Sequence, residues 1–279
     1  MGRGAKLGAK SWAAGGAAAG ALIALVLFAP AAWLASALAS ATDQRLLLSD
    51  ARGTVWNGNA VLVLAGGVGS RDASALPDRL HWRLRPEGLG VSVHATQPCC
   101  LNGELRLRVA AGLGRLRLEL PADAVAASAG PARSIGQWPA SWLVGLGTPW
   151  NTLQPSGSLQ LSSPGLVLEQ VQGRWRFTGR VELTLARLAS RLSTLDTLGS
   201  YRVTVSGDAA AAEAAQLQLL TTEGALQLSG SGQLLGAGAA SRLRFRGQAT
   251  AAVGFEAALG NLLNIIGRRQ GAFSLISIG

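Results

Sequence analysis

The 279-residue sequence predicts a mainly β protein, in which an N-terminal transmembrane helix precedes an antiparallel, curved β-sheet domain with one or two short helices. Three observations support this fold class. Residues 11–42 carry no charged side chain, and an alternation of apolar and polar residues recurs from residue 45 to the C-terminus. The 37 glycines and the low aromatic content of 5% are typical of short aliphatic strands separated by turns.

The N-terminal apolar segment is long enough to cross a bilayer. Its most apolar part, residues 17–38, matches the roughly 20 residues that a transmembrane helix needs. Arg3, Lys6 and Lys10 precede this segment without any acidic residue, and Asp43 follows it. Because basic residues accumulate on the cytoplasmic side of a membrane, we expect the N-terminus to be cytoplasmic.

The chain then divides into three parts. They are a cytoplasmic tail over residues 1–12, a transmembrane signal anchor over 13–39 and an exported β-rich domain over 43–279. The alternative is a cleaved signal peptide, because residues 37–39 form an Ala-Leu-Ala cleavage motif. In both cases the domain after the apolar segment is exported.

Most of the exported part alternates between apolar and polar residues. The clearest alternating segments are residues 60–64, 105–109, 115–120, 159–161, 181–185, 201–205, 217–219, 226–228 and 243–246. Glycine, proline, serine and asparagine separate them. A strand with this pattern buries one face and exposes the other, so the sequence predicts an antiparallel sheet with one covered face.

Three segments interrupt the alternation and are candidates for short helices. Small residues fill 122–129, leucines are spaced by four and three within 186–198, and a stripe of large apolar residues has helical spacing within 255–268. Prolines concentrate near residues 130–155, which suggests a seam between two similar β-rich halves.

The charge pattern argues against nucleic-acid binding, although the net charge is +10. The arginines alternate with leucines, as in residues 106–108 and 115–117, which is typical of the exposed face of a strand. No basic block, zinc-finger, helix-turn-helix or RNA-recognition pattern accompanies them. Contact with anionic lipid headgroups fits this pattern better than contact with nucleic acid.

The sequence carries no local signature of an enzyme. It lacks the serine-hydrolase elbow, the zinc-protease helix motif, the P-loop and the dinucleotide-binding fingerprint, and its 15 acidic residues are scattered. His81 and His94 are the only histidines, so a zinc site lacks ligands. We therefore expect a protein without catalytic residues, metal or other cofactor.

The two cysteines, Cys99 and Cys100, are adjacent. In an oxidising compartment they could form a vicinal ring, link to another chain or stay reduced. The C-x-x-C spacing of a redox centre is absent, so a structural or inert role is favoured.

One short element concentrates unusual residues a few positions beyond the apolar segment. It consists of Gly53, Thr54, Val55, Trp56, Asn57 and Gly58. A large aromatic residue between two glycines predicts a tight hairpin or bulge, with Trp56 against the sheet. Core packing is the simpler interpretation, and a partner-binding element near the membrane surface is the functional one.

These residues also carry a family resemblance. The Gly-Thr-Val-Trp-Asn-Gly element after an N-terminal anchor, followed by residues 80–86, resembles the type II secretion system protein N family. Residues 198–202, 222–232 and 262–269 are also similar to that family, so the resemblance covers roughly residues 15–275. The family has no established catalytic residues.

The resemblance implies an accessory component of the bacterial inner membrane, crossing it once, with its main domain in the periplasm. Such a scaffold or adaptor would aid the export of folded proteins across the outer membrane. The implied partners are the outer-membrane secretin and the inner-membrane component that bridges to it. The family is distantly similar to AsmA-like envelope proteins, which implies a lipid-binding or lipid-transfer module as the alternative.

Overall fold

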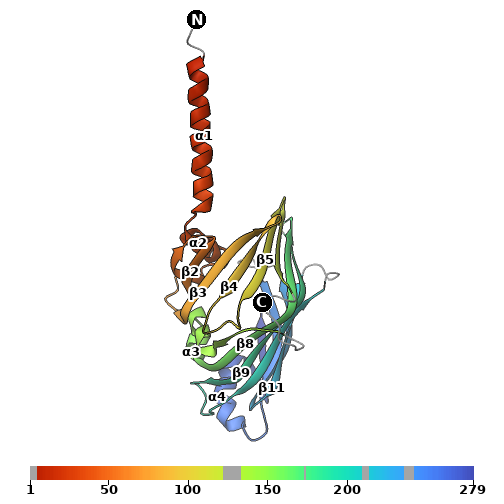
Figure 1. Ribbon diagram of the computed structural model, residues 1–279. Helices are drawn as coiled ribbons and strands as arrows, with labels where there is room; N and C mark the ends of the chain where they lie inside the picture. Colours follow the sequence, from red (N-terminus) through yellow and green to blue (C-terminus); the bar gives the residue numbers. More distant parts are fainter. Residues whose placement is uncertain (1–4, 122–132, 173, 209–213, 236–241) are drawn as a thin grey trace.

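The protein is built on one open antiparallel sheet, seen in the computed structural model of Figure 1. The structure describes residues 5–121, 133–172, 174–208, 214–235 and 242–279. Sequential strands are neighbours almost throughout, and the order is β1-β2-β3-β4-β5-β6-β8-β9-β10-β11-β12-β13-β15-β14, with β7 pairing beside this path with β8. The predicted mainly β, antiparallel fold class is confirmed.

The strands are β1 (Leu46–Gly53), β2 (Asn57–Ala65), β3 (Ala73–Glu87), β4 (Gly90–Thr96), β5 (Leu105–Gly112), β6 (Arg115–Leu120), β7 (Arg133–Pro139), β8 (Pro155–Val171), β9 (Arg174–Ser190), β10 (Gly199–Gly207), β11 (Ala214–Glu223), β12 (Leu226–Leu235), β13 (Arg242–Ala251), β14 (Arg268–Gln270) and β15 (Phe273–Ile278). The helices are α1 (Ala5–Leu27), α2 (Ala31–Ala41), the 3₁₀ helix η1 (Ala140–Leu146), α3 (Trp150–Leu153) and α4 (Glu256–Ile266).

The apolar N-terminal segment forms two helices, which corrects the prediction of one helix over residues 13–39. α1 ends at Leu27, and Pro30 has the extended conformation (φ −68°, ψ 146°) immediately before α2. Proline lacks an N–H group and suits the start of a helix better than its interior, so it ends one helix and begins the next. Within the described part of the chain, no helix combines the length and apolarity needed to span a bilayer.

The two N-terminal helices have different surroundings. α1 projects away from the rest of the molecule (Figure 1), and its Leu22, Ile23 and Val26 are all more than half exposed. In contrast, α2 packs on the first strands, where Ala31 is buried in a cluster with Trp82. The second half of the predicted membrane segment therefore belongs to the folded domain.

The sheet has one covered and one exposed face, as the alternation predicts. Leu84, Val93 and Leu107 are directly opposite one another on successive strands and belong to the covered face, which we call the inner face. α2, β7, η1, α3 and α4 contribute residues to four apolar clusters on it. The alternate positions, including Arg106 and Arg108, form the outer face, which is exposed.

The helical stripe near the C-terminus is confirmed, and the one over residues 186–198 is wrong. α4 packs its buried Leu259, Leu262 and Leu263 against the inner face. β9 instead extends to Ser190, and the following residues form turns. The candidate helix over 122–129 lies outside the described residues.

The sheet continues across the segment at residues 130–155. β6 pairs directly with the second half of β8, so Leu118 is opposite Leu168, while β7 pairs with the first half of β8. η1 and α3, which follow β7, pack on the inner face of the sheet. Strands before and after this segment are therefore joined in one sheet.

Candidate functional site

The Trp56 element forms a tight hairpin between β1 and β2, as predicted. The backbone N–H of Thr54 donates to the carbonyl of Asn57 (2.9 Å), and the Thr54 hydroxyl accepts from the N–H of Asn57 (3.1 Å). Gly53 has a positive φ of 88°, a conformation that glycine adopts without steric cost. The residue types of this element are thus explained by the geometry of the turn.

Gly58 provides the space that this turn requires. A Cβ atom at Gly58 would lie 2.5 Å from the Trp82 ring and 2.7 Å from the carbonyl oxygen of Arg52. The Trp82 ring therefore lies directly against the backbone of β2. Its indole N–H donates to the carbonyl of Val55 (3.0 Å), which fixes the turn to the sheet.

The opposite side of the turn holds the junction between α1 and α2. The indole N–H of Trp56 donates to the carbonyl of Val26 (2.7 Å), in the last turn of α1. The backbone N–H of Val55 donates to the carbonyl of Ala29 (2.8 Å), and Thr54 forms a β-bridge with Pro30. Carbonyl groups at a helix C-terminus lack partners within the helix, so the Trp56 indole also caps α1.

The six predicted partner-binding residues are therefore brought together, at the place where the apolar helix joins the sheet. Their hydrogen bonds connect α1 on one side with β3 on the other, because Leu84 also donates its N–H to the carbonyl of Trp56 (2.7 Å). The sequence predicted the hairpin but gave no signal for its contact with Val26, which is 30 residues away. Binding of another protein by these residues stays a prediction.

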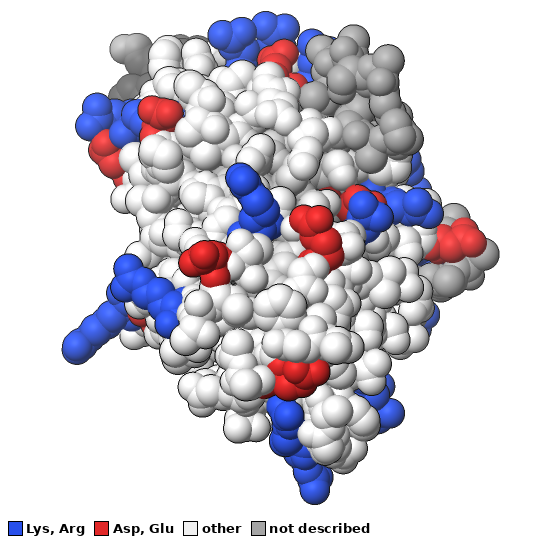
Figure 2. Space-filling view, turned by 90° about the horizontal axis from the view of Figure 1, so that it is seen from below, with Lys and Arg blue, Asp and Glu red and all other residues white. Residues whose placement is uncertain are grey.

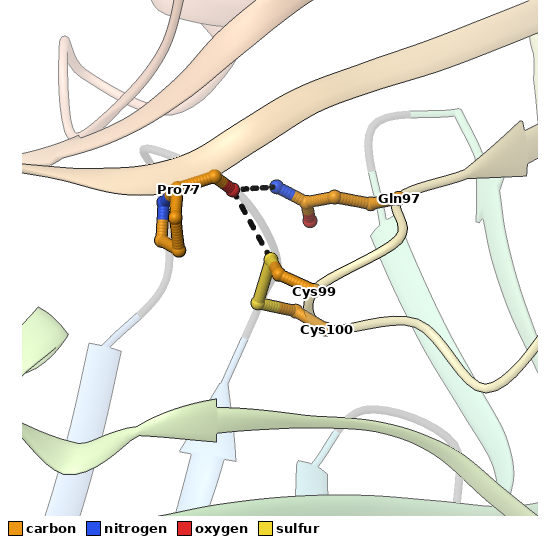
Figure 3. Close-up of a disulfide and its surroundings, with 4 residues drawn as sticks. All are labelled: Pro77, Gln97, Cys99 and Cys100. Carbon is orange, nitrogen blue, oxygen red and sulfur yellow. Dashed lines mark hydrogen bonds between the residues drawn. A yellow bond between two sulfur atoms is a disulfide. The ribbon is translucent and has the colours of Figure 1, made fainter.

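Cys99 and Cys100 form a disulfide with each other, which is one of the three states left open by the sequence (Figure 3). Cys99 is exposed and Cys100 is buried. The carbonyl oxygen of Pro77 accepts a hydrogen bond from the Gln97 side chain (3.5 Å) and lies 3.1 Å from the Cys99 sulfur. A disulfide sulfur carries no proton, so the second approach is a contact without a donor.

The loop that carries this disulfide closes the free edge of β7. The backbone carbonyl of Cys100 accepts from the N–H of Gln137 (2.8 Å), and the backbone N–H of Asn102 donates to the carbonyl of Ile135 (3.0 Å). The Asn102 side chain also donates to the Ser134 hydroxyl (2.7 Å). Since unpaired strand edges invite pairing with other chains, the loop protects β7 and gives the disulfide a structural place.

An apolar cavity of about 260 Å³ lies between the inner face, α3 and α4. Its lining consists of Trp150, Leu153, Pro155, Leu185, Leu188, Ala189, Ser190, Leu198, Tyr201, Val203, Leu219, Leu226, Leu228, Leu262 and Ile266.

The two hydroxyl groups that line the cavity are already satisfied. The Ser190 hydroxyl donates to the carbonyl of Leu153 (2.6 Å), and the Tyr201 hydroxyl donates to that of Leu226 (3.0 Å). Burial raises the pKa of Tyr201 further above its ordinary value, so its hydroxyl stays protonated. A ligand of this cavity would therefore be held by apolar contacts.

Many charged side chains on the outer face form ion pairs with a neighbour of opposite charge. Asp50 bridges two arginines, and its hydrogen bonds with Arg52 and Arg79 lower the pKa of its carboxyl group. At the end of the domain shown in Figure 2, side chains of both signs are scattered over a largely uncharged surface. Among the described residues, no group of three or more His, Cys, Asp or Glu side chains could hold a metal ion.

Comparison with known proteins identifies the family. The family model described as type II secretion system protein N matches residues 44–275, which includes nearly the whole sheet. No curated protein and no solved structure matches the chain. The match confirms the resemblance carried by the Trp56 element and the later strands. The chain belongs to the type II secretion system protein N family.

Proposed function

We propose that this chain is an accessory inner-membrane component of the type II secretion system, a periplasmic scaffold or adaptor that aids export of folded proteins across the outer membrane. Family membership supports its place in this system. The observation that carries the proposal is the fixed attachment of an exposed apolar helix, α1, to a large β domain through the Trp56 hairpin.

Three features support an inner-membrane location with the domain in the periplasm. The exposed apolar side chains of α1 include Leu22, Ile23 and Val26, and such a surface is stable when a membrane or a partner covers it. Basic residues precede this surface in the sequence, which favours a cytoplasmic N-terminus. The Cys99–Cys100 disulfide also fits an oxidising compartment.

The proposed partners are the outer-membrane secretin and the inner-membrane component that bridges to it. The sheet ends favour docking on a face over addition of a long strand. The β1 edge is interrupted by a bulge between Ser49 and Arg52, and β14 has three residues. Short or bulged edges limit pairing with another chain, so an adaptor role would use the faces of the sheet. Such a role needs contact surfaces and no catalytic residue.

Crosslinking in intact membranes tests this proposal. The tagged full chain should recover the secretin or the bridging component, and a strain lacking the chain should export less folded substrate. A matched control carries the same N-terminal 42 residues fused to an unrelated periplasmic domain. Recovery of secretion components by both proteins, or by neither, would contradict a scaffold role of the β domain.

The apolar cavity favours lipid binding as a second candidate function. An apolar cavity of about 150 Å³ is known to bind benzene, and the cavity here, at about 260 Å³, is larger and both hydroxyl groups in its lining are hydrogen-bonded. It has room for part of an acyl chain. This candidate agrees with the AsmA-like resemblance, and it assigns the chain a lipid-binding or lipid-transfer role.

Native mass spectrometry of the full chain distinguishes this second candidate. Leu219→Phe places a larger side chain in the cavity lining, and Leu220→Phe is the matched control because Leu220 is exposed on the outer face. If lipid occupies the cavity, the wild type and Leu220→Phe proteins retain it and Leu219→Phe loses it. Equal retention by all three proteins would contradict a lipid site in the cavity.

A further inference from the structure

The outer face differs in charge between its two ends. From β3 to β10, five arginines of this face pair with neighbouring carboxylates. The pairs are Arg106–Glu104 (3.4 Å), Arg108–Glu87 (3.3 Å), Arg115–Glu169 (3.8 Å), Arg117–Glu119 (3.4 Å) and Arg202–Glu182 (3.0 Å). Residues 43–223 contain 17 arginines and 14 acidic residues, so positive and negative charges nearly balance in this part of the chain.

The last strands carry arginines without such compensation. Residues 224–279 contain five arginines, at 242, 244, 246, 268 and 269, and one acidic residue, Glu256. Glu256 begins α4, which packs on the inner face, and its carboxylate accepts the N–H of Gly254 (2.9 Å). Among the described residues, Arg244 and Arg246 of β13 form no ion pair.

Arg244 and Arg246 lie in a hollow on the outer face with polar neighbours. Arg246 is opposite Ser231 on β12 and Ser277 on β15, and Arg244 is opposite Gln233. All five residues line the same surface hollow, which has a volume of about 480 Å³. The hollow thus combines two cationic groups with hydroxyl and amide donors. Gly279, the last residue of the sequence, also lines it, and no Asp or Glu side chain of the described residues does.

The floor of this hollow is well packed. Phe245, between the two arginines, points to the inner face and is buried. Its ring lies over two glycines, because a Cβ atom at Gly230 or Gly247 would come within 3 Å of it. The backbone that carries Arg244 and Arg246 is therefore fixed by close packing, so binding would order little besides the two side chains.

We propose that this hollow is a docking site for an acidic segment of a partner protein, with Arg244 and Arg246 each binding a carboxylate. The inference deepens the proposed adaptor function and rests on it. The two arginines are separated by one residue on a strand, so their Cα atoms are about 7 Å apart. Alternate residues of an extended partner segment have the same spacing, so two acidic side chains can meet both guanidinium groups.

The position of the site favours a protein segment over the membrane surface. β1 and β2, next to the proposed membrane helix, are at the opposite end of the strand order from β13. Two arginines near that helix, Arg52 and Arg79, are paired with Asp50 (2.8 Å each). Arg244 and Arg246 are thus separated from the anchor by most of the strand order, where a partner protein can reach them.

Binding of a labelled acidic peptide to the full chain in detergent tests this inference. The probe is a fluorescein-labelled peptide in which glutamate and serine alternate. We expect Arg244→Gln with Arg246→Gln to weaken its binding by about tenfold or more at low salt, because two charge-assisted contacts are lost. The control, Arg106→Gln with Arg108→Gln, removes the same net charge from paired positions and should change binding by less than about twofold.

Three outcomes would overturn the inference. They are equal loss of peptide binding in both double variants, unchanged binding in both, and loss of binding to phosphatidylglycerol vesicles but not to the peptide in the Arg244/Arg246 variant. Circular dichroism confirms that each variant is folded.

Membrane crosslinking separates the docking site from the adaptor function. If wild type recovers secretion components and the Arg244/Arg246 variant recovers them equally well, the docking site is wrong while the adaptor function stands. If wild type recovers none, the adaptor function fails whatever the peptide does.

Discussion

At the scale of single residues, two tryptophans and two glycines determine how the N-terminal helix meets the sheet. The Trp82 indole N–H donates to the carbonyl of Val55 in the turn, and the Trp56 indole N–H donates to the carbonyl of Val26 at the end of α1. Gly53 supplies the positive φ, and Gly58 leaves room for the Trp82 ring. The unusual Gly-Thr-Val-Trp-Asn-Gly sequence therefore has a structural explanation within the chain. A partner can use this element only on the sides that these contacts leave open.

Gly58→Ala should destabilise the domain by about 1–3 kcal/mol, which is the usual cost of overpacking a core. The added methyl group would overlap the Trp82 ring and the backbone of Arg52. Gly112→Ala is the control, because no atom lies within 4 Å of a Cβ at Gly112 and its φ is not positive. Urea unfolding measures both variants, and equal midpoints would contradict the tight packing at Gly58.

Trp56→Phe should loosen the α1–α2 junction while the sheet stays folded. The change removes the N–H that reaches Val26, and the loss of one such hydrogen bond costs about 1 kcal/mol. Hydrogen exchange should then become faster at Val55 and in the last turn of α1. Trp33→Phe serves as the control, because Trp33 is half exposed on α2. Faster exchange in both variants, or in neither, would argue against the bond.

At the scale of elements, the sequence pattern predicts what depends on local periodicity. The alternating strands and α4 follow from their own residues. The helix expected over residues 186–198 fails because β9 contains an irregularity: Arg187 has a positive φ of 50°, and the pairing with β8 shifts between Ser156 and Ser158. Leu188 packs on the inner face at the end of β9, and Leu192 and Leu195 pack on it from the turns that follow, so three leucines at helical spacing are partly buried without a helix.

The N-terminal elements show a second limit of local pattern. The alanine-rich α2 has the composition of a membrane segment, but its small side chains let it pack closely on β1 and β2. Apolar composition alone does not distinguish burial in a lipid bilayer from burial on a sheet. The contacts of the Trp56 hairpin likewise depend on residues far apart in the sequence, so the hairpin could be predicted and its role at the junction could not.

The loop of residues 97–102 gives a prediction for β7. Replacing both Cys99 and Cys100 with serine removes a crosslink that restricts this loop, so its backbone should move more freely. Hydrogen exchange should accelerate at the amides of Asn102 and Gln137, which join the loop to β7. The amides between β9 and β10 provide the internal control and should not change. Unchanged exchange at the β7 contacts would show that the backbone bonds hold the loop without the disulfide.

At the scale of the whole molecule, one continuous sheet connects the proposed membrane anchor with the proposed docking face. β1 and β2 carry α2 and the junction to α1, while β13, between β12 and β15, carries Arg244 and Arg246. Antiparallel pairing runs unbroken between them. A rigid sheet of this kind would hold a partner-binding surface at a fixed distance from the membrane, which is what an adaptor requires.

Two truncations separate the anchor from the folded domain, and they should behave differently. Removing residues 1–27 behind a cleavable signal peptide takes away α1, whose contact with the domain includes a single side-chain hydrogen bond, from Trp56. We expect this variant to leave the membrane fraction and to keep nearly the wild-type unfolding midpoint. Removing residues 1–42 also takes away α2 and uncovers Leu48, Ala60 and Trp82. The second variant should lose about 3 kcal/mol or more, because two or more apolar side chains lose their cover.

Membrane fractionation and urea unfolding of the two truncations test separate claims. If the chain lacking residues 1–27 stays in the membrane fraction, α1 is not the anchor and the exposed apolar helix needs another partner. If both truncations unfold at the same urea concentration, α2 adds nothing to the domain. The expected split between the two measurements would place the boundary between anchor and domain at Pro30, within the apolar segment, because the proline there ends the first helix and the packing of Ala31 begins the second.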